Sequence, residues 1–195
     1  TYLVQRAKPR MFRAATRGIE GVETRMVGRD DELEQLQDAF HSVYREQRLV
    51  AIAIVAEAGL GKSRLLYEFE SWAEAQPEMF FVLRGRAQPL TEQQPYGLLR
   101  DMFASRLQIV DSDDPATARE KLVAGIAPLL GHDGEAQVHV LGHVIGLDFS
   151  SSPHVRGLLD DARQLRNRAF HAAAQTLRRM TEREARPAML VVDDL

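Results

Sequence analysis

The sequence contains no cysteine among its 195 residues. This absence excludes a disulfide framework and a cysteine-based metal site. No apolar run approaches the roughly 18 residues that a membrane-spanning helix needs, and the first residues lack the pattern of a secretory signal. We therefore expect a cytoplasmic protein with no membrane among its partners.

The formal net charge is only −3, so the sequence provides no general attraction to nucleic acid. Hydrophobic residues make up 45% and charged residues 27%, as in ordinary soluble domains. Residues 1–26 are expected to be a linker from an upstream domain, because a basic run with no acid before Glu20 is usually solvated. Contact of this run with nucleic acid is the less favoured alternative.

An apolar run from Leu49 to Val55 leads into a glycine-rich segment that ends in Gly61-Lys62-Ser63. Four of the seven residues in the run are β-branched, which favours a strand buried on both faces, as in a parallel sheet. After the segment, apolar residues recur at helical spacing: Leu65, Leu66, Phe69, Trp72 and Ala73. A strand, a glycine-rich turn and a helix form the setting of a phosphate-binding loop.

The loop predicts a nucleoside triphosphate and Mg²⁺ as cofactors. Glycines let the backbone approach phosphate oxygens, the lysine reaches the β- and γ-phosphates, and the serine hydroxyl ligates the metal. Ala56 replaces the first glycine of the usual pattern, and a glycine turn without a ligand is the alternative interpretation. The predicted nucleotide-binding residues here are Ala56, Glu57, Ala58, Gly59, Leu60, Gly61, Lys62, Ser63 and Arg64, with Lys62 also catalytic and Ser63 also a metal ligand.

A second apolar run, residues 188–192, ends in Asp193 and Asp194. An acid at the carboxyl end of a parallel strand is the magnesium-side partner of a phosphate loop. We expect Asp193 to hold Mg²⁺, through water, and Asp194 to act as a catalytic general base. A strand that ends in a solvated turn is the alternative.

The remaining pattern completes an α/β fold of the P-loop NTPase class, with a parallel sheet, flanking helices and a helical insertion before the Asp193 strand. Asp30 is expected to cap a first helix with an apolar stripe, and Met79–Leu83 to form a second strand. The insertion is expected to contain helices over about 96–107, 115–131, 134–145 and 155–185. Residues 27–195 are interpreted as the N-terminal part of a truncated P-loop domain that lacks later strands.

Two histidines, His139 and His143, lie four residues apart on a predicted helix. This spacing can bind zinc, but Val140 stands where metalloproteases have a glutamate, and the sequence offers no third ligand. The pattern therefore favours packed or solvated histidines.

Three segments resemble the AAA-type ATPase domain of signal-transduction NTPases (STAND-like proteins). They are Val27-Gly28-Arg29-Asp30-Asp31-Glu32-Leu33, the loop with its flanks from Glu57 to Leu66, and Leu190-Val191-Val192-Asp193-Asp194-Leu195. In that family the domain follows class III adenylate or guanylate cyclase domains, or belongs to large transcriptional regulators.

The resemblance implies that Val27 and Gly28 contact adenine and that Arg29 lies near the ribose or phosphates. It also implies a sensor strand between the loop strand and the acid strand, so an isolated fragment should be poorly stable and inactive. The implied partners are ATP and the upstream and downstream domains of the same polypeptide, while self-association into an oligomer stays open.

Three functions fit these observations. A slow ATPase acting as a conformational switch requires ATP binding through Lys62 and turnover through Asp194. A phosphotransferase requires an acceptor pocket and lid arginines, and a non-catalytic platform would bind nucleotide without turnover. We favour the switch, as a regulatory module of a multidomain signalling protein.

Overall fold

The computed structural model describes residues 26–86 and 96–193. The chain divides into two compact units, Thr1–Ala75 and Gln76–Leu195. Among the described residues, no helix is both long enough and apolar enough to cross a membrane.

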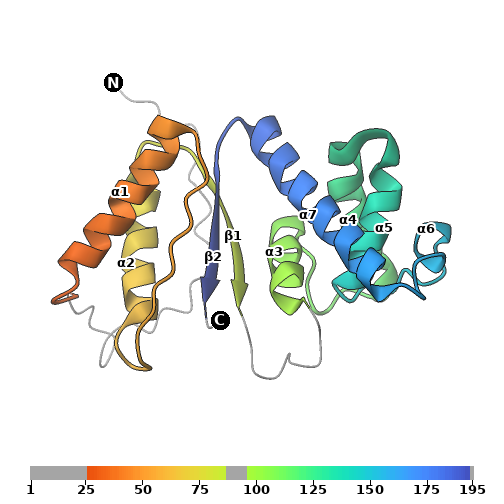
Figure 1. Cartoon of the computed structure of the whole chain (residues 1–195), viewed down its shortest axis with the longest axis horizontal. Helices are drawn as coiled ribbons and strands as arrows, with labels where there is room; N and C mark the ends of the chain where they lie inside the picture. Colours follow the sequence, from red (N-terminus) through yellow and green to blue (C-terminus); the bar gives the residue numbers. More distant parts are fainter. Residues whose placement is uncertain (1–25, 87–95, 194–195) are drawn as a thin grey trace. The chain divides into compact units, whose positions relative to one another are not determined.

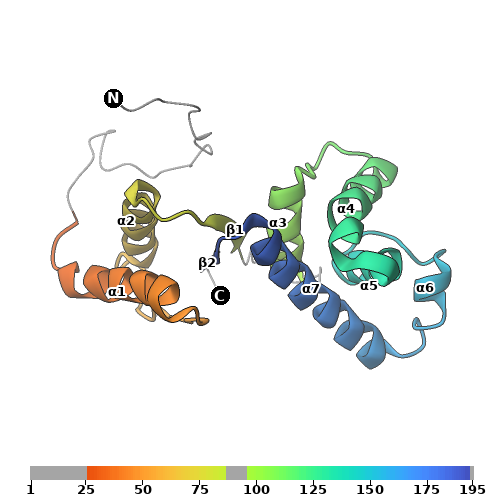
Figure 2. The ribbon, with the colours of Figure 1, turned by 90° about the horizontal axis from the view of Figure 1, so that it is seen from above.

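The first unit contains two helices, α1 (Asp30–Glu46) and α2 (Lys62–Ala75), which lie side by side in Figures 1 and 2. The predicted apolar stripe of α1 is confirmed, with Leu36 and Phe40 buried. The predicted cap is wrong by one residue. Arg29 occupies the N-cap position without a side-chain capping bond, and Asp30 begins the helix. Three acids in the first turn stabilise α1 through their interaction with the positive end of the helix dipole.

Aromatic side chains hold α1 on α2. The Phe40 ring lies edge-on to Phe69 at a centroid distance of 6.4 Å and to Trp72 at 5.5 Å. The Phe69 and Trp72 rings stack at 6.0 Å with an interplanar angle of 23°. Offset and edge-to-face pairs of this kind add to the stabilisation that burial provides.

The strand predicted at residues 49–55 is not formed. Its residues have no strand assignment, and Leu49 and Val55 are 91% and 90% exposed. A strand requires a ladder partner for its N–H and C=O groups. Within the described residues, the two strands present pair with each other, so this apolar segment has no ladder partner there.

The second unit contains a parallel pair of strands, β1 (Phe81–Arg86) and β2 (Ala188–Asp193). Leu83 pairs with Leu190 in the middle of the register. The second predicted strand is therefore confirmed, but it begins two residues later than expected and continues through Arg86. The predicted apolar strand before Asp193 is also confirmed.

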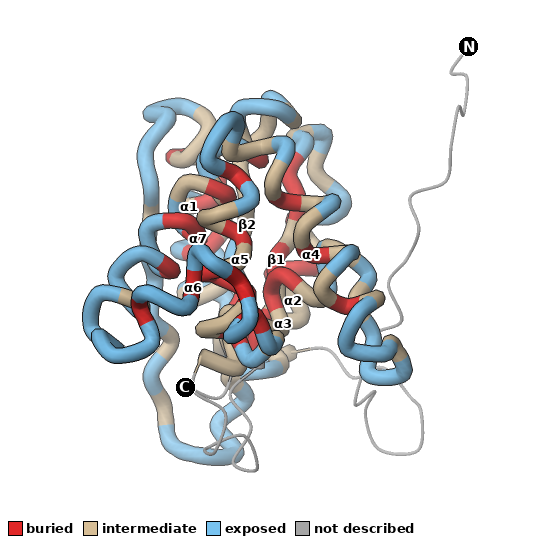
Figure 3. Tube along the Cα trace, turned by 90° about the vertical axis from the view of Figure 1, so that its right-hand side faces the viewer, coloured by how far each residue is buried: buried red, intermediate tan, exposed pale blue. Residues whose placement is uncertain are grey.

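The predicted helical insertion lies between these strands in the sequence. Its elements are α3 (Gly97–Leu107), α4 (Pro115–Leu130), the 3-10 turn η3 (Gly131–Asp133), α5 (Gly134–Val144), α6 (Pro153–Arg156) and α7 (Ala162–Glu184). The core of the unit lies among these helices and β1, where buried stretches alternate with exposed ones along each helix (Figure 3). Its fully buried side chains include Phe103, Leu122, Ile126, Val138, Leu141 and Val155.

The single long helix predicted over residues 155–185 is wrong in its first part. The chain instead forms the short α6, a turn, and then α7 from Ala162. The Asp161 side chain accepts a hydrogen bond from the Gln164 N–H at 2.9 Å and so caps α7. Aspartate competes for backbone donors in this way, which favours a helix start over a helix interior.

Gly85 allows α3 to approach β1 closely. A Cβ at this position would lie 2.8 Å from the Leu98 side chain and 2.9 Å from the Leu98 carbonyl oxygen. Near the other end of β1, the Arg106 guanidinium lies 5.3 Å from the Phe81 ring centroid and forms an ion pair with Glu184. These contacts fix α3 against β1 and join it to the end of α7.

We predict that Gly85→Ala destabilises the second unit by about 1–3 kcal/mol, because the new methyl group overpacks the contact with Leu98. Urea unfolding followed by circular dichroism measures this change. Gly157→Ala is the matched control, since a Cβ there meets no atom within 4 Å. Equal midpoints for the two variants would contradict the close approach.

The Asp114 side chain caps α4. The Asp114 carboxylate accepts hydrogen bonds from the Ala116 N–H at 2.9 Å and the Thr117 N–H at 3.1 Å, and Pro115 occupies the first turn. The hydrogen bond from the Thr117 hydroxyl, together with these amides, holds the pKa of Asp114 below its usual value.

We predict that Asp114→Ala destabilises the chain at pH 7 and that this effect shrinks below about pH 4. A carboxylate with a lowered folded pKa contributes stability above its unfolded pKa, and this is lost as the pH falls through the folded pKa. Urea midpoints at several pH values test this. Asp111→Ala, which removes an exposed acid from the preceding loop, should show no comparable effect.

Candidate functional site

The glycine-rich segment forms a tight turn that opens α2. The Leu60 N–H donates to the Glu57 carbonyl at 3.3 Å, which closes a turn over residues 57–60. The Leu65 N–H then donates to the Gly61 carbonyl at 2.9 Å as the first helical bond. The predicted loop-to-helix transition is therefore present, and the N–H groups of the first helical turn, which have no partner within the helix, lie at its end.

Gly59 and Gly61 adopt left-handed backbone angles, with φ of +84° and +80°. Residues with a Cβ are strained in this region, which explains why glycine is needed at both positions. A Cβ at either position would meet no atom of the described residues within 4 Å, so this part of the chain leaves open space beside the loop backbone.

The Lys62 ammonium lies against its own loop. It donates to the Ala56 carbonyl at 2.6 Å and to the Glu57 carbonyl at 3.0 Å. Lys62 is also the first residue of α2, so its positive charge lies close to the helix N-terminus. The lysine charge and the positive end of the helix dipole both favour the binding of an anion at this loop.

Arg29 connects the lead-in segment to this loop. Its guanidinium donates to the Leu60 carbonyl at 3.1 Å and to the Glu32 carboxylate at 2.6 Å. The hydrogen bond from Arg29 holds the pKa of Glu32 below its usual value, which favours the ionised carboxylate. Sequence analysis missed Glu32. Its position three residues after Arg29, in the first turn of the predicted helix, was the available signal.

The other predicted residues of this unit differ in their surroundings. Val27 is 86% exposed, and Gly28 has a left-handed φ of +74°. Ser63 is exposed in the first turn of α2. Arg64 forms an ion pair with Glu68 one turn along the helix, and its guanidinium lies 5.7 Å from the Tyr67 ring centroid. Arg64 is thus engaged along α2.

The acidic part of the prediction falls in the second unit. Asp193 is the last residue of β2, in register with Arg86 of β1. Asp194 lies outside the described residues. The structure thus brings together Arg29, the loop and Lys62, whereas the pairing of Ser63 with Asp193 around a metal remains a prediction.

A family model of the AAA ATPase domain matches residues 25–195. The chain belongs to this family. No curated protein and no solved structure matches the chain significantly.

Membership of the AAA ATPase domain family implies the P-loop NTPase fold and nucleotide binding. The parallel pair β1–β2, with helices between the strands, is compatible with this fold. The matched residues contain the loop, its lead-in and the strand that ends at Asp193.

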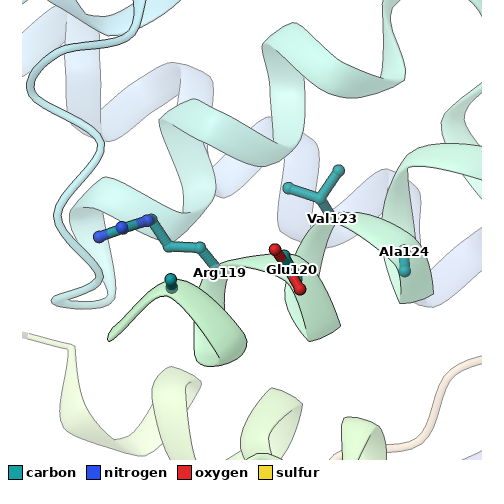
Figure 4. Close-up of a pocket in the computed structure, with 5 residues that line it drawn as sticks. Arg119, Glu120, Val123 and Ala124 are labelled. Carbon is teal, nitrogen blue, oxygen red and sulfur yellow. The ribbon is translucent and has the colours of Figure 1, made fainter. Parts of the chain in front are cut away.

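A shallow hollow of about 460 Å³ lies over α4 in the second unit (Figure 4). It is lined by Ala116, Arg119, Glu120, Val123 and Ala124. All five residues belong to one helix, and none is among the predicted site residues. We therefore assign this hollow no part in nucleotide binding.

We predict that Arg29→Ala speeds hydrogen exchange of the amides at residues 57–62 about fivefold, because a charge-assisted hydrogen bond to the loop is lost. Hydrogen–deuterium exchange with mass spectrometry measures this rate. Arg48→Ala is the matched control, since Arg48 is also an arginine paired with a nearby carboxylate, but its hydrogen bond goes to Glu46 and not to the loop. Unchanged exchange in Arg29→Ala would show that the contact does not order the loop.

Proposed function

We propose that the chain is an ATP-binding, Mg²⁺-dependent regulatory ATPase module that acts as a conformational switch. The observation that carries this proposal is the conformation of the loop. Two glycines in left-handed backbone angles leave open space beside it, and the Lys62 ammonium lies within 3.0 Å of two of its carbonyls.

These residues fit a polyphosphate. A triphosphate needs backbone amides, a helix N-terminus and a mobile cation within a small volume. The loop supplies all three between Ala56 and Ser63. The carbonyls that now accept from Lys62 are neutral, so a phosphate oxygen would be the stronger acceptor for its ammonium.

Each residue then has a proposed role. The amides of Glu57, Ala58, Gly59 and Gly61 bind phosphate oxygens, Leu60 closes the turn between them, and Ala56 and Arg64 lie at the two ends of the binding segment. Lys62 neutralises charge on the transferred phosphoryl group, Ser63 and Asp193 hold the metal, and Asp194 accepts a proton from the attacking water. Val27 and Gly28 lie against the base. Bound ATP and Mg²⁺ would supply the phosphoanhydride and a divalent charge across its phosphates.

The switch is supported by the bridge from Arg29 to the loop. Arg29 contacts the Leu60 carbonyl with one nitrogen and the Glu32 carboxylate with another. A displacement of Leu60 on nucleotide binding would therefore be transmitted through Arg29 to Glu32 in the first turn of α1. Local electrostatic events at a phosphate site become larger movements when such a contact is made or broken.

The wider setting is a proposal that rests on the resemblance to signal-transduction NTPases. We propose that residues 27–195 belong to the ATPase domain and that residues 1–26 join it to an upstream domain, such as a class III nucleotide cyclase. The basic composition of residues 6–17 supports a solvated connector. A cytoplasmic location is proposed with this setting.

We predict that Lys62→Ala weakens ATP binding by about 10- to 100-fold, because a charge-assisted contact to phosphate is lost. Calorimetry with ATP and Mg²⁺ measures the affinity. Lys121→Ala is the matched control, since it also removes one lysine charge but acts on Asp113 and the Gln108 carbonyl in the second unit.

Two outcomes separate the alternatives. Binding by Lys62→Ala equal to that of the parent would refute the site. ATP binding without phosphate release in the complete polypeptide, unchanged by Asp194→Asn, would replace the switch ATPase with a non-catalytic platform.

A further inference from the structure

A cluster of possible metal ligands lies in the second unit, away from the loop in sequence. Glu135 and His139 are one turn apart on the same face of α5, and His154 comes from α6. Among the described residues, their ligand atoms lie within 4.8 Å of one another. The sequence pointed to His143 as the partner of His139 and offered no third ligand. The fold instead brings His154 of α6 next to His139 and Glu135 of α5.

We propose that Glu135, His139 and His154 bind one Zn²⁺ ion or a similar divalent transition-metal ion. Two imidazoles and a carboxylate match the ligand types that zinc takes in proteins with three protein ligands and water. Imidazole nitrogen favours zinc, cobalt, nickel and copper over the Mg²⁺ that accompanies a nucleotide. This site is therefore chemically distinct from the proposed nucleotide site.

The His139 ring is already oriented for ligation. It stacks on Phe149 at a centroid distance of 4.6 Å and an angle of 27°. Its Nδ1 lies 2.8 Å from the buried Ser152 hydroxyl oxygen, while its Nε2 lies 3.9 Å from the Glu135 carboxylate. Metal-binding histidines commonly engage one ring nitrogen with a neighbouring group and present the other to the ion.

Ser152 connects the two histidines. Its hydroxyl oxygen accepts a hydrogen bond from the His154 N–H at 3.2 Å and so caps α6. The same oxygen contacts His139 Nδ1. One buried hydroxyl thus fixes both the ring on α5 and the start of the helix that carries His154. The ring centroids of the two histidines lie 5.7 Å apart.

The distances require only a modest adjustment. Tetrahedral zinc with bonds of about 2.0 Å places its donor atoms about 3.3 Å apart. Since no two of the ligand atoms are more than 4.8 Å apart, each separation would close by at most about 1.5 Å. Glu135 and His154 are exposed, so rotation of their side chains can close it. Ligation would then cross-link α5 to α6.

The test uses the purified 195-residue chain, treated with chelator and free of nucleotide. Calorimetry with Zn²⁺ and visible absorption with Co²⁺ measure stoichiometry and geometry. We expect one ion per chain with tetrahedral absorption, and an affinity at least about tenfold lower in Glu135→Gln and in His154→Gln. Both residues are exposed, so these variants should keep the parent far-UV circular dichroism.

His171→Gln is the matched control, because it removes an exposed imidazole that contacts Gln175 on α7. Parent-like affinity in this control and loss in His154→Gln would support the site. Equal affinity in the parent, Glu135→Gln and His154→Gln would overturn it, as would the absence of stoichiometric binding in a chain whose circular dichroism shows it folded.

Discussion

The aromatic packing of α1 on α2 is the contact on which the candidate nucleotide site depends. Phe40 meets Phe69 and Trp72 across the two helices. The residues before α1 and the loop before α2 lie 31 positions apart at the Arg29–Leu60 contact. Without helix packing, a single hydrogen bond at that separation would not offset the entropy of ordering both segments. The core of the first unit is thus also the support of its chemistry.

The phosphate loop could be predicted because its conformation is determined locally. Glycine at positions 59 and 61 is required by left-handed backbone angles, and the helix that follows has its own apolar period. The helix caps at Asp114 and the helix of residues 97–107 were predictable for the same reason. Each depends on side chains within one turn of the feature they determine.

Features that depend on distant partners were not predictable from the same patterns. Residues 49–55 have the composition of a buried strand, but composition does not supply a ladder partner. The long helix expected after residue 155 has a continuous apolar stripe, yet Asp161 competes for the backbone and starts the helix later. The approach of His154 to His139 depends on the turn between α5 and α6, for which the sequence carries no periodic signal.

The pairing of β1 with β2 has a further consequence for how the second unit folds. The strands that pair are separated by residues 87–187, so their contact order is high. Closing a loop of about 100 residues costs about 4 kcal/mol in its length-dependent entropy alone. We expect contacts between α3, α4, α5 and α7 to form first and so to shorten that loop before the strands meet. The helical insertion therefore serves as the scaffold on which the acid-bearing strand can find its register.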